Sequence, residues 1–189
     1  MEMFEYIVVI TSIIIGLAVT DLLKGVAQLI QHPGRRPVYW VHLLWVAYMF
    51  LTAVFWWWWE YRYREIATWS FQLYFFVLVY AFVIYLACAL LFPRDFAGYL
   101  GYRDYYYSRR RWFFGLLAAY FLIDIADTAF KGAEHFASLG VQYPVAMGTL
   151  FALAVIGAIT RNERYHGTFA VLALTYQVYW ALRMFETIE

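Results

Sequence analysis

The chain has 189 residues, of which 65% are hydrophobic, 23% aromatic and only 14% charged, and its mean hydropathy is +0.61. Soluble domains have about half apolar and about a quarter charged residues, so this composition excludes an ordinary soluble protein. A net charge of +1 gives no basis for binding nucleic acid, and the single cysteine, Cys88, excludes an internal disulfide. We therefore expect an integral membrane protein whose main partner is the lipid bilayer.

The chain begins with MEMFEYIVVITSIIIGLAVTDLL, which is predicted to be a first membrane span. It carries acidic residues where a cleavable signal peptide needs basic ones, and no small-x-small cleavage pattern follows. A bilayer core of about 30 Å needs about 20 apolar residues per helix. Six segments meet this requirement and predict an all-α fold with six transmembrane helices, over residues 4–30, 38–59, 69–92, 112–136, 143–160 and 167–185.

The second segment ends in four consecutive tryptophans, followed at once by EYRYRE. Four consecutive helical residues point in all directions, so they favour an aromatic belt at the membrane interface over a one-sided ligand site. The same interpretation applies to the arginine run that follows three tyrosines in the connection 93–111, which we expect to lie along the lipid headgroups. The predicted interfacial residues are Trp56, Trp57, Trp58, Trp59, Arg109, Arg110 and Arg111.

Positive charge predicts the orientation of the helices. Ten of the fourteen Lys and Arg residues lie in or beside the connections that follow the first, third and fifth predicted spans. Because such loops are usually cytoplasmic, both termini are expected on the non-cytoplasmic side. We expect a plasma membrane, as in the inner membrane of a bacterium.

A weak internal match relates the two halves of the chain. At a constant offset of 107 residues, the pairs Lys24–Gly25, Pro37–Val38 and Leu43 match Lys131–Gly132, Pro144–Val145 and Leu150. Three spans per unit would make the second unit enter from the opposite side, as in the inverted repeats of many transporters. The expected organisation is a unit at 1–92, the connection 93–111 and a second unit at 112–189.

Two acids in the fourth predicted span are the main functional candidates. Asp124 and Asp127 lie within an apolar helix, where each charge costs about 2.5–3.5 kcal/mol. Lys131 lies four residues beyond Asp127 and can pair with it, while it can also extend towards the interface. The acids should therefore face the interior, either at an ion or substrate path or bonded to a Tyr, Thr or Trp that holds the bundle together. Expected companions are Thr20, Asp21, Tyr176 and Gln177.

Other chemistry finds little support. The chain lacks HExxH, GxSxG and a glycine-rich phosphate loop. A DxxD pair could hold Mg²⁺ in a lipid-modifying enzyme, but these acids lie too deep for a headgroup. His42 and His135 fall at opposite ends of the predicted bundle and cannot share one haem. We predict a non-enzyme without a metal or other cofactor.

The expected function is a channel or small transporter that passes a proton, another cation or a small polar solute. The alternative is a non-transporting membrane module that binds a lipid or a partner membrane protein. A water-accessible path to Asp124 would favour transport, whereas a dry, bonded carboxyl would favour the module. A homo-oligomer is compatible with either.

Overall fold

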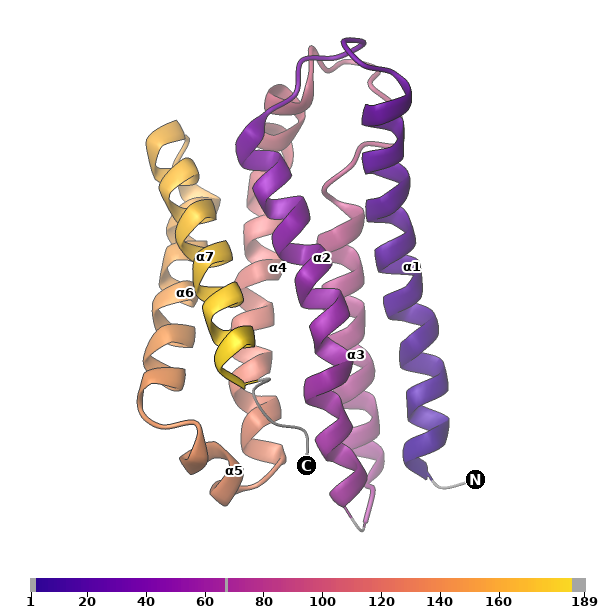
Figure 1. Ribbon diagram of the computed structural model, residues 1–189, viewed down its shortest axis with the longest axis vertical. Coiled ribbons are helices and arrows are strands. Elements are labelled where there is room, and N and C mark those ends of the chain that lie inside the picture. Colours follow the sequence, from indigo (N-terminus) through magenta and orange to yellow (C-terminus); the bar gives the residue numbers. More distant parts are fainter. Residues whose placement is uncertain (1–2, 67, 185–189) are drawn as a thin grey trace.

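The computed structural model describes residues 3–66 and 68–184 and is all-helical over these ranges. Its elements are α1 (Met3–Gln31), α2 (Trp40–Glu60), the 3₁₀ helix η1 (Tyr61–Glu65), α3 (Phe71–Ala89), α4 (Tyr102–Phe130), α5 (Ala133–Ser138), α6 (Gln142–Ile159) and α7 (Glu163–Met184). The long helices run up and down in one bundle (Figure 1). The links between α1 and α2, α3 and α4, and α6 and α7 lie at the upper end of that view.

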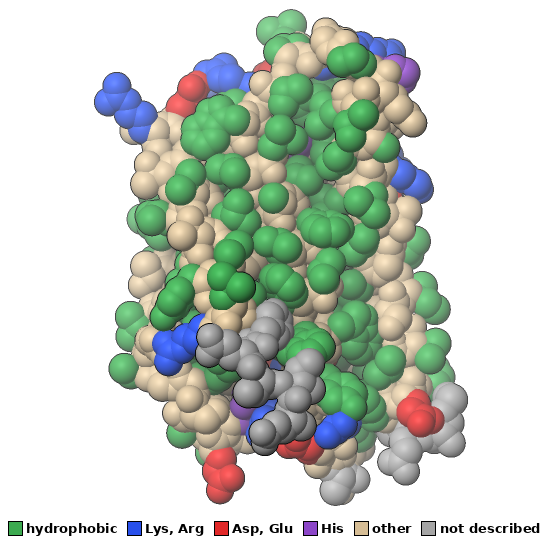
Figure 2. All heavy atoms as spheres, in the orientation of Figure 1, with side chains coloured by type: hydrophobic (Ala, Val, Ile, Leu, Met, Phe, Trp, Pro, Cys, Tyr) green, Lys and Arg blue, Asp and Glu red, His purple; other side chains and the backbone are tan. Residues whose placement is uncertain are grey.

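Five of these helices are long and apolar enough to cross a membrane: α1, α2 with η1, α3, α4 and α6. Their outer faces carry apolar side chains, for example Val9, Ile13 and Leu17 on α1, which are 53–60% exposed. Figure 2 shows apolar side chains over the middle of one face and charged side chains towards its two ends. Apolar surface in such a band indicates a membrane-embedded protein. The sixth predicted span corresponds to α7, which has the length but not the hydropathy, because Gln177 and several tyrosines interrupt its apolar residues.

The helices pack as two groups, which are joined by the contacts of α3 with α4 and of α2 with α7. Helix α1 packs mainly against α3, α4 mainly against α6, and α7 mainly against α2. In Figure 1, α1, α2 and α3 lie on one side of the molecule and α4, α6 and α7 on the other. The space where these two groups face each other contains the candidate site.

The fourth helix begins within the connection predicted at 93–111, so the predicted start of the fourth span at residue 112 is wrong. Helix α4 begins at Tyr102, ten residues before the predicted start, and continues without interruption to Phe130. Tyr102, Tyr105, Tyr106 and Arg110 are buried on one face of these added turns. Their spacing of three, one and four residues follows the helical repeat, so packing of this face extends the helix. The predicted span 112–136 also ends too late, since α4 stops before Gly132 and α5 is separate.

The inverted repeat is not confirmed by the fold. Lys24 and Gly25 lie inside α1, whereas Lys131 and Gly132 end α4, where Gly132 has a φ of +117°. Lys24 is exposed, while the Lys131 side chain is only 4% exposed. The packing also differs, because α3 packs on α1 but its counterpart α7 packs mainly on α2 rather than on α4.

Candidate functional site

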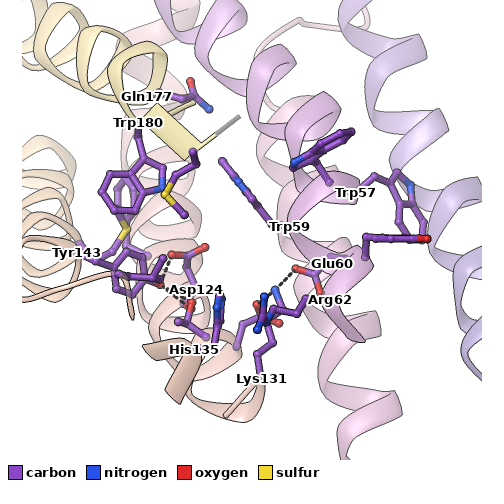
Figure 3. A pocket seen from close by; sticks show the side chains of 18 of the residues that line it. Trp57, Trp59, Glu60, Arg62, Asp124, Lys131, His135, Tyr143, Gln177 and Trp180 are labelled. Carbon is purple, nitrogen blue, oxygen red and sulfur yellow. Dashed lines mark hydrogen bonds and ion pairs between the residues drawn. The ribbon is translucent and has the colours of Figure 1, made fainter. Parts of the chain in front are cut away.

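A cavity of about 700 Å³ opens at the η1 and α5 end of the bundle. Its walls come from α2, η1, α4, α5, α6 and α7, and they combine aromatic rings with a small group of charged side chains. Figure 3 shows Trp59 of α2 and Trp180 of α7 near the acids of α4. The cavity extends inward as far as Tyr48 and Gln177. Tyr48 lies twelve residues before Glu60 on α2, which corresponds to a depth of about 18 Å along the helix.

The charged group near the opening is centred on Lys131. Its Nζ donates to Glu60 Oε1 at 3.0 Å and to Asp127 Oδ2 at 2.5 Å. The three side chains are 4%, 4% and 2% exposed, respectively. The Tyr63 hydroxyl donates to the other oxygen of Asp127 at 2.8 Å, and the Lys131 amine lies 5.0 Å from the centre of the Tyr63 ring. The predicted Asp127–Lys131 pair is confirmed, but Lys131 is enclosed by acids and does not extend outward to the interface.

Asp124 lies one turn further in, and among the described residues its carboxylate accepts hydrogen bonds from two neutral tyrosine hydroxyls. Tyr80 of α3 donates to Oδ1 at 2.7 Å, and Tyr143 of α6 donates to Oδ2 at 2.6 Å. Because Tyr143 has a single proton, the Thr128 hydroxyl, 2.7 Å away, donates to the Tyr143 oxygen. These bonds join α3, α4 and α6 around one carboxyl. Asp124 is nevertheless only partly buried and lines the cavity.

Neutral polar groups line the inner end. The Gln177 amide of α7 lies 2.7 Å from the Thr52 hydroxyl of α2. With the amide oxygen and nitrogen exchanged, the nitrogen donates to the Tyr48 carbonyl at 3.1 Å and the oxygen accepts from the Thr52 hydroxyl at 2.7 Å. Gln177 thus bonds α7 to α2 beside the deepest part of the cavity.

Beyond the inner end, the bundle is closed by packed aromatic rings, which we call the aromatic plug: Trp45, Phe113, Phe114 and Phe169. The Trp45 ring lies 5.5, 5.3 and 5.0 Å from the other three ring centres. Trp45 and Phe114 are fully buried. The aromatic plug separates the cavity from the end of the bundle that carries the α1–α2 link.

The cavity brings together most of the predicted path residues but not all of them. Asp124, Asp127, Lys131, Tyr176 and Gln177 line it. Thr20 and Asp21 lie on α1, outside the lining, and the exposed Thr20 hydroxyl bonds to the Gly16 carbonyl of its own helix. Both were expected companions of the acids, and the fold places neither of them in the cavity lining.

The predicted interfacial residues divide into inner and outer positions. Trp56 is 1% exposed and packs on Tyr80, whereas Trp57, Trp58 and Trp59 line the cavity. Arg109 and Arg111 are exposed. Arg110 is 6% exposed, and its guanidinium donates to the Thr160 and Ile159 carbonyls at the end of α6. Arg110 therefore has a structural role that a run of three arginines does not reveal.

Sequence reasoning missed Glu60, Tyr63, Tyr80 and Tyr143. Glu60 was assigned to a turn, yet it is the last residue of α2 and lies 3.0 Å from Lys131, 71 positions away in the chain. Tyr63, Tyr80 and Tyr143 lie 64, 44 and 19 positions, respectively, from the acids that they contact. The one available signal was that a deep carboxyl needs hydrogen-bond donors, and tyrosine is abundant here.

The charges at the site favour a cation. Four acids, Glu60, Glu65, Asp124 and Asp127, line the cavity with three bases, Lys131, Arg62 and Arg64. Among these bases only the Lys131 side chain is buried, and it is paired with Glu60 and Asp127. Burial, together with nearby Arg62 and Lys131, lowers the pKa of His135, so this imidazole on the cavity wall is neutral at pH 7 and does not offset the acids. Within residues 3–66 and 68–184, no group of three or more His, Cys, Asp or Glu side chains is arranged to hold a metal ion.

Comparison of the chain with protein-family models, curated proteins and solved structures finds no match.

Proposed function

We propose that the protein is a small membrane transporter that passes a cation or a small polar solute, with Asp124 as its central binding group. The observation that carries the proposal is the depth of the cavity, which reaches Asp124 from one end of the bundle and stops before the aromatic plug. Access from one side at a time is typical of a carrier with a site near the midplane. A channel would need a continuous path through the position of Trp45.

The finer architecture belongs to the same proposal. The 22 residues of α7 rise about 33 Å, which is enough to complete a sixth span. The connections after the first, third and fifth spans carry the excess of positive charge and would be cytoplasmic. The cavity mouth and both termini would then lie on the non-cytoplasmic side of a bacterial inner membrane. The inverted repeat rests on the sequence match alone, and a homo-oligomer would be compatible with the exposed apolar faces.

Asp127, Lys131 and Glu60 would serve as a fixed electrostatic environment at the entrance. Lys131 offsets one acid, which leaves the region attractive to a cation but less so than three free carboxylates. A cation that reaches Asp124 would exchange neutral tyrosine donors for a direct ionic contact. Transport requires binding that is favourable enough for entry and weak enough for release.

One observation favours the alternative, a non-transporting module that binds a lipid or a partner membrane protein. Both oxygens of Asp124 already accept hydrogen bonds from neighbouring helices, which is how a structural carboxyl would be satisfied. In that case the acids hold the bundle together and recognition takes place elsewhere.

Ion flux in proteoliposomes tests the proposal, with protons, potassium, sodium and chloride examined in turn. Wild-type protein should pass a cation, and Asp124→Asn should reduce the flux at least about tenfold, because it removes a deep carboxylate that forms no ion pair among the described residues. Asp21→Asn, on α1 and outside the cavity lining, is the matched control and should leave flux unchanged. No flux of any of these ions above empty liposomes would favour the non-transporting module.

A further inference from the structure

We propose that the ligand of this cavity is a small amphipathic organic cation, an ammonium compound with an apolar substituent, held between the aromatic walls and the carboxylate of Asp124. This inference rests on the proposed function for its physiological role, because it names the class of solute that would be carried. Binding itself can be measured without transport.

The charge of Asp124 favours a cationic ligand. In the described parts of the chain, Asp124 forms no ion pair, and its two carboxylate oxygens accept from Tyr80 and Tyr143. Glu60 and Asp127 share the single amine of Lys131. With all three acids ionised, the inner cavity therefore has more negative than positive charge. A cationic ligand would restore the balance at low dielectric, where the attraction is strong.

Glu60 also favours a cation, because one of its oxygens is a hydrogen-bond acceptor without a donor. Glu60 is 3% exposed and lines the cavity; its Oε1 accepts from Lys131. Its Oε2 has no hydrogen-bond partner among the described residues, and neither has the Tyr176 hydroxyl further in. Buried acceptors are normally satisfied. The unsatisfied oxygen has almost no exposed surface, so it acts on a ligand in the cavity through its negative charge at short range and not through direct contact.

The aromatic lining of the cavity favours a cationic ligand as well. Trp57, Trp59, Trp180, Tyr48 and Tyr120 all line the cavity, and Figure 3 shows Trp59 and Trp180 entering the same region from α2 and α7. Ring faces attract cations, and aromatic cages are a common way to recognise ammonium groups. Two rings at this site already lie near cations: Tyr63 at 5.0 Å from Lys131 and Trp180 at 5.8 Å from Arg183.

Size selects an organic ligand over a bare ion. The cavity of about 700 Å³ falls within the range of about 300–1,000 Å³ that holds small organic molecules. Leu139, Met147 and Leu150 add aliphatic wall, which an inorganic cation would leave without a partner. A wholly apolar ligand would leave the acids without a counter-charge. A cation with an apolar substituent satisfies both parts of the wall.

The test measures the binding of benzyltrimethylammonium to the purified protein in detergent by isothermal titration calorimetry. This probe has a permanent charge, and its neutral analogue neopentylbenzene has the same shape. We expect the cation to bind at least about tenfold more tightly than the neutral analogue, and Asp124→Asn to weaken its binding at least about tenfold. Asp21→Asn should have no effect.

A second pair of variants covers the possibility that Asp124→Asn fails to fold. Trp59→Leu removes an aromatic face of the cavity, whereas Trp112→Leu removes a 70% exposed tryptophan outside its lining. Only the first should weaken binding. Equal affinity for the neutral analogue, or equal effects of the two tryptophan variants, would overturn the inference. Binding of the organic cation without any flux would support the inference and reject transport. Proton or sodium flux without binding of the organic cation would support transport and reject the inference.

Discussion

Lys131 stabilises two carboxylates that belong to different helices. Its amine bonds to Asp127 one turn earlier on α4 and to Glu60 at the end of α2, and the three side chains are almost fully buried. Removing ions from water is costly, so these two buried acids depend on the single amine that they share. The lysine therefore determines whether α2 and α4 can approach each other at the cavity mouth.

This arrangement predicts a large effect of Lys131→Met on stability. The substitution keeps much of the side-chain volume but leaves two buried acids without a base, which should lower the free energy of unfolding by about 3–5 kcal/mol. Unfolding by SDS in mixed micelles measures the difference. Lys24→Met, at an exposed position of α1, should change it by less than about 0.5 kcal/mol.

A second substitution separates charge from packing in this prediction. Adding Glu60→Gln to Lys131→Met removes one of the two uncompensated acids and should restore part of the lost stability. If the double variant is as unstable as the sum of both single changes, the three residues do not act as one electrostatic group.

At this scale, the sequence predicted only interactions that are local in the chain. Asp127 and Lys131 are four residues apart on one helix, so helical geometry alone indicated their pair. Glu60, Tyr80 and Tyr143 reach the acids from other helices. No periodicity relates residues on different helices, and these contacts depend on the packing of α2, α3 and α6 around α4.

Helix α4 illustrates how composition and periodicity can conflict. Its first ten residues, YRDYYYSRRR, have the composition of a headgroup segment, and on that basis they were predicted to lie outside the span. The buried positions Tyr102, Tyr106 and Arg110 recur every four residues, which is a helical signal. Composition outweighed periodicity in the prediction, whereas in the structure the packed face determines where the helix begins.

Arg110 gives this element a measurable test. Its guanidinium bonds to the last carbonyls of α6, which have no partner within that helix. Arg110→Ala should lower the free energy of unfolding by about 1.5–3 kcal/mol, the usual value of hydrogen bonds to a charged group. Arg111→Ala, at the neighbouring exposed position, should cost less than about 0.5 kcal/mol. Equal losses in mixed-micelle unfolding would reject the capping role.

At the scale of the whole molecule, hydropathy was sufficient to predict the five apolar helices but not how they are arranged. Each of the five apolar helices overlaps a predicted segment, because about 20 apolar residues without charge have few other uses. The packing of α7 on α2 and the one-sided cavity were not predictable, since they depend on which faces meet. The sequence match that suggested an inverted repeat aligned the exposed Lys24 with Lys131, whose side chain is buried.

Orientation is the property of the whole molecule that the transport proposal needs most. The cavity mouth, near Arg62, lies at the opposite end of the bundle from Arg35 in the α1–α2 link. If the arginine-rich connections are cytoplasmic, the mouth faces outward, and the site loads from the external side. A membrane-impermeant maleimide distinguishes the two ends, because the single native thiol, Cys88, is buried.

We expect Arg62→Cys to react in intact spheroplasts and Arg35→Cys to react only after permeabilisation, both in a Cys88→Ala background. Both positions are exposed, so access to the reagent and not burial decides the outcome. The reverse pattern would mean that the cavity opens to the cytoplasm. The acids would then collect a cation from inside the cell, and the same geometry would describe an exporter that loads at Asp124.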